Sequence, residues 1–174
     1  IRAVIERRFA PINQERLRLL EECQQTAGDR TPSVEQILEA FLLPMVLIGM
    51  KRSKSNSYLM QLGGRILLES GASFERIVEE QFKEVARRFF EAFQQAMPQL
   101  APNEIAWRMN FTIGAAAKAM FAGIPIKVLS NMFQQADEVF EVEQIASLLI
   151  GYTAAGMKAP EPAAWENRGE LPSS

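Results

Sequence analysis

The sequence predicts an all-α fold, a helical bundle of about six helices in which the last two form a four-helix-bundle dimer interface. Apolar residues recur three and four positions apart through most of the chain, and no segment shows the alternation of a half-buried strand. Prolines, glycines and short polar breaks divide this pattern into segments of helix length. The 174 residues are enough for one domain with a core of its own.

The first helix is expected to run from Ile1 to about Ala27. Pro11 lacks an amide hydrogen and should bend or break this helix near Phe9, whereas Gly28 suits its end. The helical pattern begins at once, without an initiator methionine, so the sequence is expected to start inside a longer protein.

The second helix should open at Thr31, an N-cap residue followed by Pro32 at the first helical position. It continues to Gly49. Pro44 lies inside it, cannot donate to the carbonyl of Ala40, and should kink the helix so that a polar carbonyl is exposed in an apolar segment.

Two helices follow the polar break at Lys51–Ser57. The first is expected over about Tyr58–Ser70 and is stopped by Gly71. The second is capped by Ser73 and runs to Met97, because the proline that comes next forbids continuation. Its apolar residues are spaced as one face of a helix: Phe74, Ile77, Val78, Phe82, Val85, Phe89, Phe93 and Met97.

The last two helices are expected from Pro102 to about Phe121 and over Val142–Met157. The segment between them, Gly123–Val139, is less regular. The tail from Ala159 is rich in proline, alanine, serine and glutamate and is expected to be flexible.

Composition excludes several functions for this segment. The net charge of -2 and the sequence pI of about 5.4 argue against a nucleic-acid surface, which needs clustered lysine and arginine. The longest uncharged runs, Ala40–Met50 and Ile145–Met157, are too short to cross a membrane. The single cysteine, Cys23, and the lack of a signal sequence favour the cytoplasm.

Catalytic chemistry is not expected, because the chain contains no histidine. The usual general base, the commonest metal ligand and the histidine-activated nucleophiles are therefore missing. Cys23 follows Glu21 and Glu22, whose negative charge should raise the pKa of its thiol. We expect no catalytic residue, no metal and no cofactor.

A small-molecule pocket is one interpretation of the aromatic and methionine side chains, since aromatics line ligand pockets and methionine fills irregular spaces. Arg65 could receive a ligand carboxylate or phosphate at the pocket mouth. Ordinary core packing explains the same spacing more simply, and both interpretations remain open. The candidate ligand-binding residues are Phe41, Met45, Ile48, Met60, Arg65, Phe82, Phe89, Trp107 and Phe111.

A dimer interface is the second candidate site. Gly114 and the alanines after it form a seam of small residues that would let two helices approach closely, and the apolar surfaces of the last two helices are too broad for one core-facing stripe. A thoroughly buried intramolecular core is the alternative. The candidate interface residues are Ile113, Ala116, Met120, Ile145, Leu148, Leu149, Tyr152 and Ala155.

Three stretches resemble one protein family. The opening Ile1–Phe9, IRAVIERRF, resembles the chain directly after the helix-turn-helix of TetR-type bacterial transcription regulators. Trp107–Phe111 with Gly114–Ala116 resembles the first dimerisation helix of that family, and Ile145–Met157 resembles the second. The resemblance extends over about Ile1–Met157 and is weak in the middle.

This resemblance implies a regulatory domain of a repressor. Residues 1–9 would be the end of a linker helix from a missing DNA-binding head, residues 10–158 the ligand-binding and dimerisation domain, and residues 159–174 a flexible tail. The homodimer would bind operator DNA through that head and not through this segment, and would release the DNA when a small, apolar effector binds. A fatty acid or an acyl thioester is the implied effector class, and no membrane is involved.

A freestanding all-helical lipid-binding or dimeric scaffold module without a DNA role is the alternative. A helix-turn-helix of roughly 45 residues encoded directly before Ile1 would distinguish the two.

Overall fold

The computed structural model describes residues 2–51, 72–120 and 141–160. Within these ranges it contains five helices and no strand, so the all-α prediction is confirmed. The helix expected over Tyr58–Ser70 and the segment Gly123–Val139 lie outside the described residues. The five helices are α1 (Arg2–Ala27), α2 (Val34–Lys51), α4 (Ala72–Ala96), α5 (Pro102–Met120) and α7 (Val142–Met157).

Helix α1 continues through Pro11, so Pro11 does not break it, and the bend that was the other expectation near Phe9 stays a prediction. Proline removes only one hydrogen bond of the helix, the one to the carbonyl of Arg7, and Arg7 is exposed to water that can replace it. The expected boundary between residues 9 and 10 therefore falls inside one helix. At the other end the prediction is confirmed: Gly28 adopts a φ of 60° and its N–H donates to the carbonyl of Gln24 at 3.2 Å.

Helix α2 begins two residues later than expected, because Ser33 and not Thr31 caps it. The Ser33 Oγ accepts the backbone N–H of Gln36 at 3.2 Å, and the Ser33 N–H donates to Gln36 Oε1 at 2.9 Å. This reciprocal pair is a capping box. The prediction took Thr31 as the cap because it precedes Pro32. The hydrogen bonds between Ser33 and Gln36 instead fix the start of the helix.

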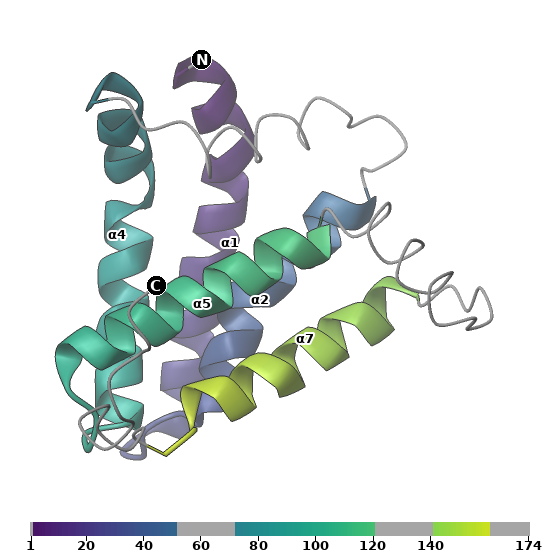
Figure 1. Ribbon diagram of the computed structural model, residues 1–174. Helices are drawn as coiled ribbons and strands as arrows, with labels where there is room; N and C mark the ends of the chain where they lie inside the picture. Colours follow the sequence, from purple (N-terminus) through teal and green to yellow (C-terminus); the bar gives the residue numbers. More distant parts are fainter. Residues whose placement is uncertain (1, 52–71, 121–140, 161–174) are drawn as a thin grey trace, which may run out of the picture.

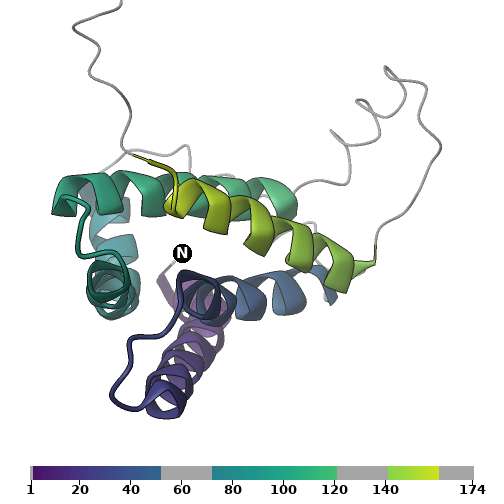
Figure 2. The same ribbon diagram turned by 90° about the horizontal axis from the view of Figure 1, so that it is seen from below.

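The five helices form two layers, one of α1, α2 and α4 and the other of α5 and α7. Helix α2 packs against α1, α4, α5 and α7, and α1 also packs against α4. Figure 1 shows α5 and α7 running antiparallel, side by side, across the lower parts of α1, α2 and α4. In Figure 2 these two helices form a layer whose far side faces away from α1, α2 and α4.

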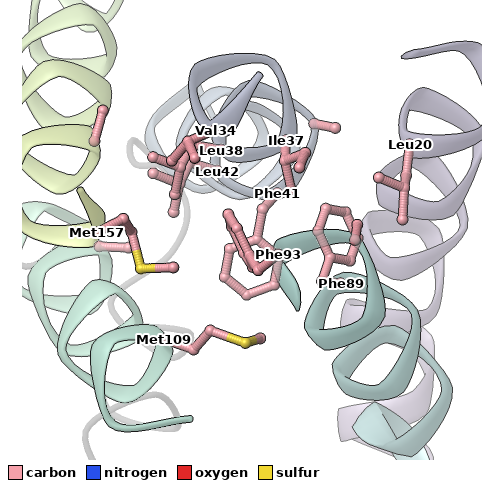
Figure 3. Close-up of a cluster of buried hydrophobic side chains, with 14 of the residues drawn as sticks. Leu20, Val34, Ile37, Leu38, Phe41, Leu42, Phe89, Phe93, Met109 and Met157 are labelled. Atoms are coloured by element: carbon pink, nitrogen blue, oxygen red, sulfur yellow. The ribbon is translucent and has the colours of Figure 1, made fainter. Parts of the chain in front are cut away.

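The core lies between the layers, and every described helix contributes to it (Figure 3). Helix α2 is apolar on most of its surface because it has neighbours on most sides. The labelled core residues are Leu20 from α1; Val34, Ile37, Leu38, Phe41 and Leu42 from α2; Phe89 and Phe93 from α4; Met109 from α5; and Met157 from α7.

Among the helices described here, none has the length and apolar character required to cross a membrane.

Candidate functional site

The interior between α2 and α4 contains two of the residues predicted to bind a ligand. Phe41 and Phe89 are both buried, and their ring centroids lie 4.9 Å apart in a tilted arrangement (Figure 3). Ring pairs at this distance are stabilising. The two residues therefore contact each other in the core, and their role in ligand binding stays a prediction.

Arg16 from α1 joins this volume and was missed by the sequence analysis. Its side chain is only 4% exposed, and its Nε donates to the carbonyl oxygen of Phe41 at 2.7 Å. Its Nη1 donates to Asn13 Oδ1 at 3.2 Å, and its Nη2 lies 3.4 Å from the Sδ of Met45. The guanidinium carbon is also 4.5 Å from the centre of the Phe41 ring.

The accepting carbonyl belongs to the helix that contains Pro44. Pro44 has no N–H for the carbonyl of Ala40, one residue before Phe41. The side chain of Arg16 donates to the next carbonyl, that of Phe41. The expectation that Pro44 exposes the carbonyl of Ala40 is not tested by this contact and stays a prediction.

A signal for Arg16 was present in the sequence. Ile12, Arg16 and Leu20 are spaced four apart, so they share one helix face, and Ile12 and Leu20 are buried. Burial lowers the pKa of Arg16 to about 10, which still leaves it positively charged near neutral pH.

Two further candidates are half-buried. Phe82 is half-buried, and its ring meets that of Phe9 edge-on with centroids 5.3 Å apart, which links α4 to α1. Met45 is half-buried and contacts Arg16. The side chain of Ile48 and the residues Met60 and Arg65 lie outside the described part of the structure.

Trp107 and Phe111 do not face the interior, and this part of the prediction is wrong. They are 62% and 65% exposed, and their ring centroids lie 5.8 Å apart on the outer side of α5. Ile105 and Met109 of the same helix are buried instead. Both sides of α5 are apolar, so periodicity could not show which side packs inward.

All five large apolar side chains that are exposed in the described part of the chain lie on α5 and α7. We call this surface the α5–α7 apolar face. A groove of about 710 Å³ runs along it between the two helices, with Gly114 and Ala155 in its lining. The five side chains are Trp107, Phe111, Ile113, Leu148 and Tyr152.

The predicted interface residues divide into two groups. Ile113, Leu148, Tyr152 and Ala155 are exposed, as an interface requires, and Ile145 is half-buried. Ala116 and Leu149 are instead buried in the core of the chain, so their assignment to the interface is wrong. A helix that is apolar on two sides has both an inner and an outer row, and these two residues belong to the inner row. The side chain of Met120 is outside the described residues.

Arg108 fixes α7 against α5. Its Nη1 donates to the carbonyls of Met157 at 2.6 Å and Ala159 at 2.7 Å, and lies 3.3 Å from that of Gly156. A cation at these last carbonyls satisfies groups that a helix end leaves without partners. Arg108 also forms an ion pair with Glu104, its neighbour one turn away.

Cys23 and the acidic residues that the structure describes form no metal site. Burial, and then the negative charge of Glu39, raise the pKa of the Cys23 thiol, so the predicted direction is confirmed although the main cause is different. Among the described residues, no group of three or more cysteine, aspartate or glutamate side chains could hold a metal ion.

Comparison with protein families gives one match. Residues 39–156 match the model of the tetracyclin repressor-like, C-terminal domain family. No curated protein and no solved structure matches the chain.

Proposed function

Because this chain belongs to the tetracyclin repressor-like C-terminal domain family, we propose that it binds a small effector and, as a dimer, controls operator binding by a DNA-binding head. In this proposal the N-terminal part of α1 connects the regulatory domain to the head. The family supports a regulatory role in transcription; the effector, the release of DNA and the residues involved are our proposal.

The α5–α7 apolar face carries the dimer part of the proposal. Exposed large apolar side chains gathered on one part of a folded chain mark an interaction site, and among the described residues they lie on α5 and α7. A second copy turned by a two-fold axis would cover the same residues on both chains and complete a bundle of four helices.

Two glycines on this layer support close approach by another helix. Gly114 and Gly151 are exposed within helices, where glycine is unfavourable by about 0.5–1 kcal/mol relative to alanine. Apart from the adjoining residues and backbone of its own helix, a Cβ at either position would meet no described atom within 4 Å. Packing inside the chain therefore does not require glycine, whereas the backbone of a partner helix would.

The effector part rests on the packing of α1 against α2 and α4. Arg16 and Phe41 join α1 to α2, and Phe9 joins α1 to α4 through Phe82. A ligand that binds beside these contacts and changes how the helices pack would move α1 relative to the α5–α7 layer. The ligand shifts the equilibrium only if it binds one arrangement more tightly than the other.

Distance measurements between spin labels test the mechanism. Glu6 is exposed on α1, so Glu6→Cys in a Cys23→Ser background places one label on each chain of the dimer. Adding octanoate or octanoyl thioester should change the label separation and weaken binding of the full gene product to the DNA upstream of its gene. Unchanged separation and unchanged DNA affinity with bound ligand would contradict the mechanism.

A further inference from the structure

The described part of the chain buries two arginines, and they differ in how their charge is balanced. Arg108, 8% exposed, forms an ion pair with Glu104. Arg16, 4% exposed, contacts only uncharged groups in the described part of the chain: a carbonyl, an amide oxygen and a thioether. A buried cation without an anion is strongly unfavourable, so a site that retains one is suited to an anion from outside.

Arg16 also has donors to spare. A guanidinium carries five N–H groups. The contacts with Phe41, Asn13 and Met45 occupy one N–H on Nε, one on Nη1 and one on Nη2, and the thioether is a weak acceptor. One N–H on each terminal nitrogen is therefore left without an acceptor among the described residues. Donors on both terminal nitrogens match the two oxygens of a carboxylate.

The contacts hold the guanidinium in place before any ligand arrives. Asn13 itself is anchored, because its Nδ2 donates to the carbonyl of Gln81 on α4 at 3.1 Å. The ring of Phe41 lies against the guanidinium, at 4.5 Å from its carbon. Fixed donors lose little conformational entropy when a ligand binds, which favours affinity.

The surroundings indicate what the rest of the ligand is like. The ring of Phe41 lies against Arg16 and contacts the ring of Phe89, and the half-buried Met45 also contacts Arg16. Aromatic and methionine side chains favour an apolar ligand body. One guanidinium balances one negative charge, whereas a phosphate ester would bring more charge than Arg16 alone can neutralise. The acyl group of a thioester is uncharged.

We propose that Arg16 binds the carboxylate of the effector, which makes the effector a monocarboxylic acid with an apolar body rather than its thioester. This inference rests on the proposed function for the existence of an effector, and it specifies the chemical class. Arg16, on α1, is then the residue through which the ligand acts on that helix.

Calorimetric titration of the full chain with matched probes tests the proposal. Butanoate, octanoate and dodecanoate are each compared with the alcohol of equal length. The unmodified chain should bind its best acid at least about tenfold more tightly than the matching alcohol, the effect of a charged hydrogen-bonded contact. Arg16→Met should abolish this preference and leave alcohol binding unchanged, while Arg16→Lys should keep part of it.

Arg18→Met is the matched control, because Arg18 lies on the same helix, is exposed and pairs with Glu15 and Glu22. It should bind acids and alcohols as the unmodified chain does. Circular dichroism shows whether each variant folds; if Arg16→Met does not, Arg16→Lys and the acid-to-alcohol ratio of the unmodified chain decide the matter.

Three results would overturn the assignment. The unmodified chain could bind acids no better than alcohols, it could bind none of the probes, or Arg16→Met could keep the full preference. An equal loss for acids and alcohols in Arg16→Met would also overturn it, since that loss indicates a structural role for Arg16. None of these titrations contains DNA, so acid binding through Arg16 without a change in label separation or DNA affinity would refute only the repressor mechanism.

Discussion

Leu148 and Leu149 are neighbours on α7 that face opposite environments, and this makes them a matched pair. Leu148 is 60% exposed on the α5–α7 apolar face, whereas Leu149 is 7% exposed in the core. If a second copy covers the face, Leu148→Ala should weaken the dimer and leave the fold of each chain intact. Leu149→Ala should instead destabilise the fold.

The exposed fraction sets the size of the first effect. Full burial of a leucine side chain stabilises by about 1.5–3 kcal/mol. Since 60% of Leu148 is exposed, covering it in the dimer should contribute about 1–2 kcal/mol per chain to the free energy of association. A two-fold dimer contains the residue twice, so dissociation should become easier by about 2–4 kcal/mol, or roughly 30-fold to 1,000-fold. Leu149→Ala should cost each chain about 2–5 kcal/mol of unfolding free energy.

Sedimentation equilibrium measures the dimer dissociation constant, and urea unfolding followed by circular dichroism measures stability. Unfolding is recorded at two protein concentrations, because dimerisation makes apparent stability depend on concentration. A dissociation constant unchanged in both Leu148→Ala and Leu148→Arg would refute a dimer through this face. Dissociation of Leu149→Ala without loss of stability would refute the assignment of the inner and outer rows.

Three other substitutions test the packing around the site. Phe89→Ala empties space beside Phe41 in the core and should lower the unfolding free energy by about 3–5 kcal/mol in urea titration; a loss below about 1 kcal/mol would contradict its burial. Arg108→Met removes the donor at the end of α7 and should cost about 1–3 kcal/mol. Hydrogen exchange should then be faster in the last turn of α7, and unchanged exchange there would disprove the capping role. Lys158→Met breaks the exposed ion pair with Glu35 and should cost less than about 1 kcal/mol. The hydrogen bond from Lys158 lowers the pKa of Glu35, so this contribution should be complete above pH 4.5, the ordinary value, and should disappear as the pH falls below it; equal acid unfolding curves for both proteins would show that the pair contributes nothing.

Local chemistry was sufficient for most helix boundaries. The bounds of α7 agree with the prediction, and α1 ends before Gly28 because only glycine adopts a positive φ without strain. The start of α2 was misplaced because Thr31 and Ser33 are both good caps, and only the hydrogen bonds with Gln36 distinguish them. Pro11 was assigned too much weight, since one lost hydrogen bond does not end a helix that packs along its length.

Orientation and long-range pairing were beyond the sequence. Spacing shows that a residue belongs to a face, but when both faces of a helix are apolar it does not show which one packs inward. The prediction therefore placed Trp107 inside and Ala116 at the surface, whereas Trp107 is exposed and Ala116 is buried. The helix that carries both was predicted correctly. Arg16 contacts a carbonyl 25 residues away on another helix, and no local pattern specifies that partner.

The helical character of the chain follows from the spacing of its apolar residues, a pattern that extends over only a few residues at a time. The lack of histidine, and with it of histidine-based catalysis, follows from composition. The outer position of the α5–α7 apolar face and the buried guanidinium of Arg16 depend on which helices are neighbours. Neighbours are selected by the packing of the whole core, because every buried side chain must fill space left by the others. For this reason the tertiary structure alone could separate the exposed apolar face, which we propose for a second copy, from the interior, which we propose for a ligand.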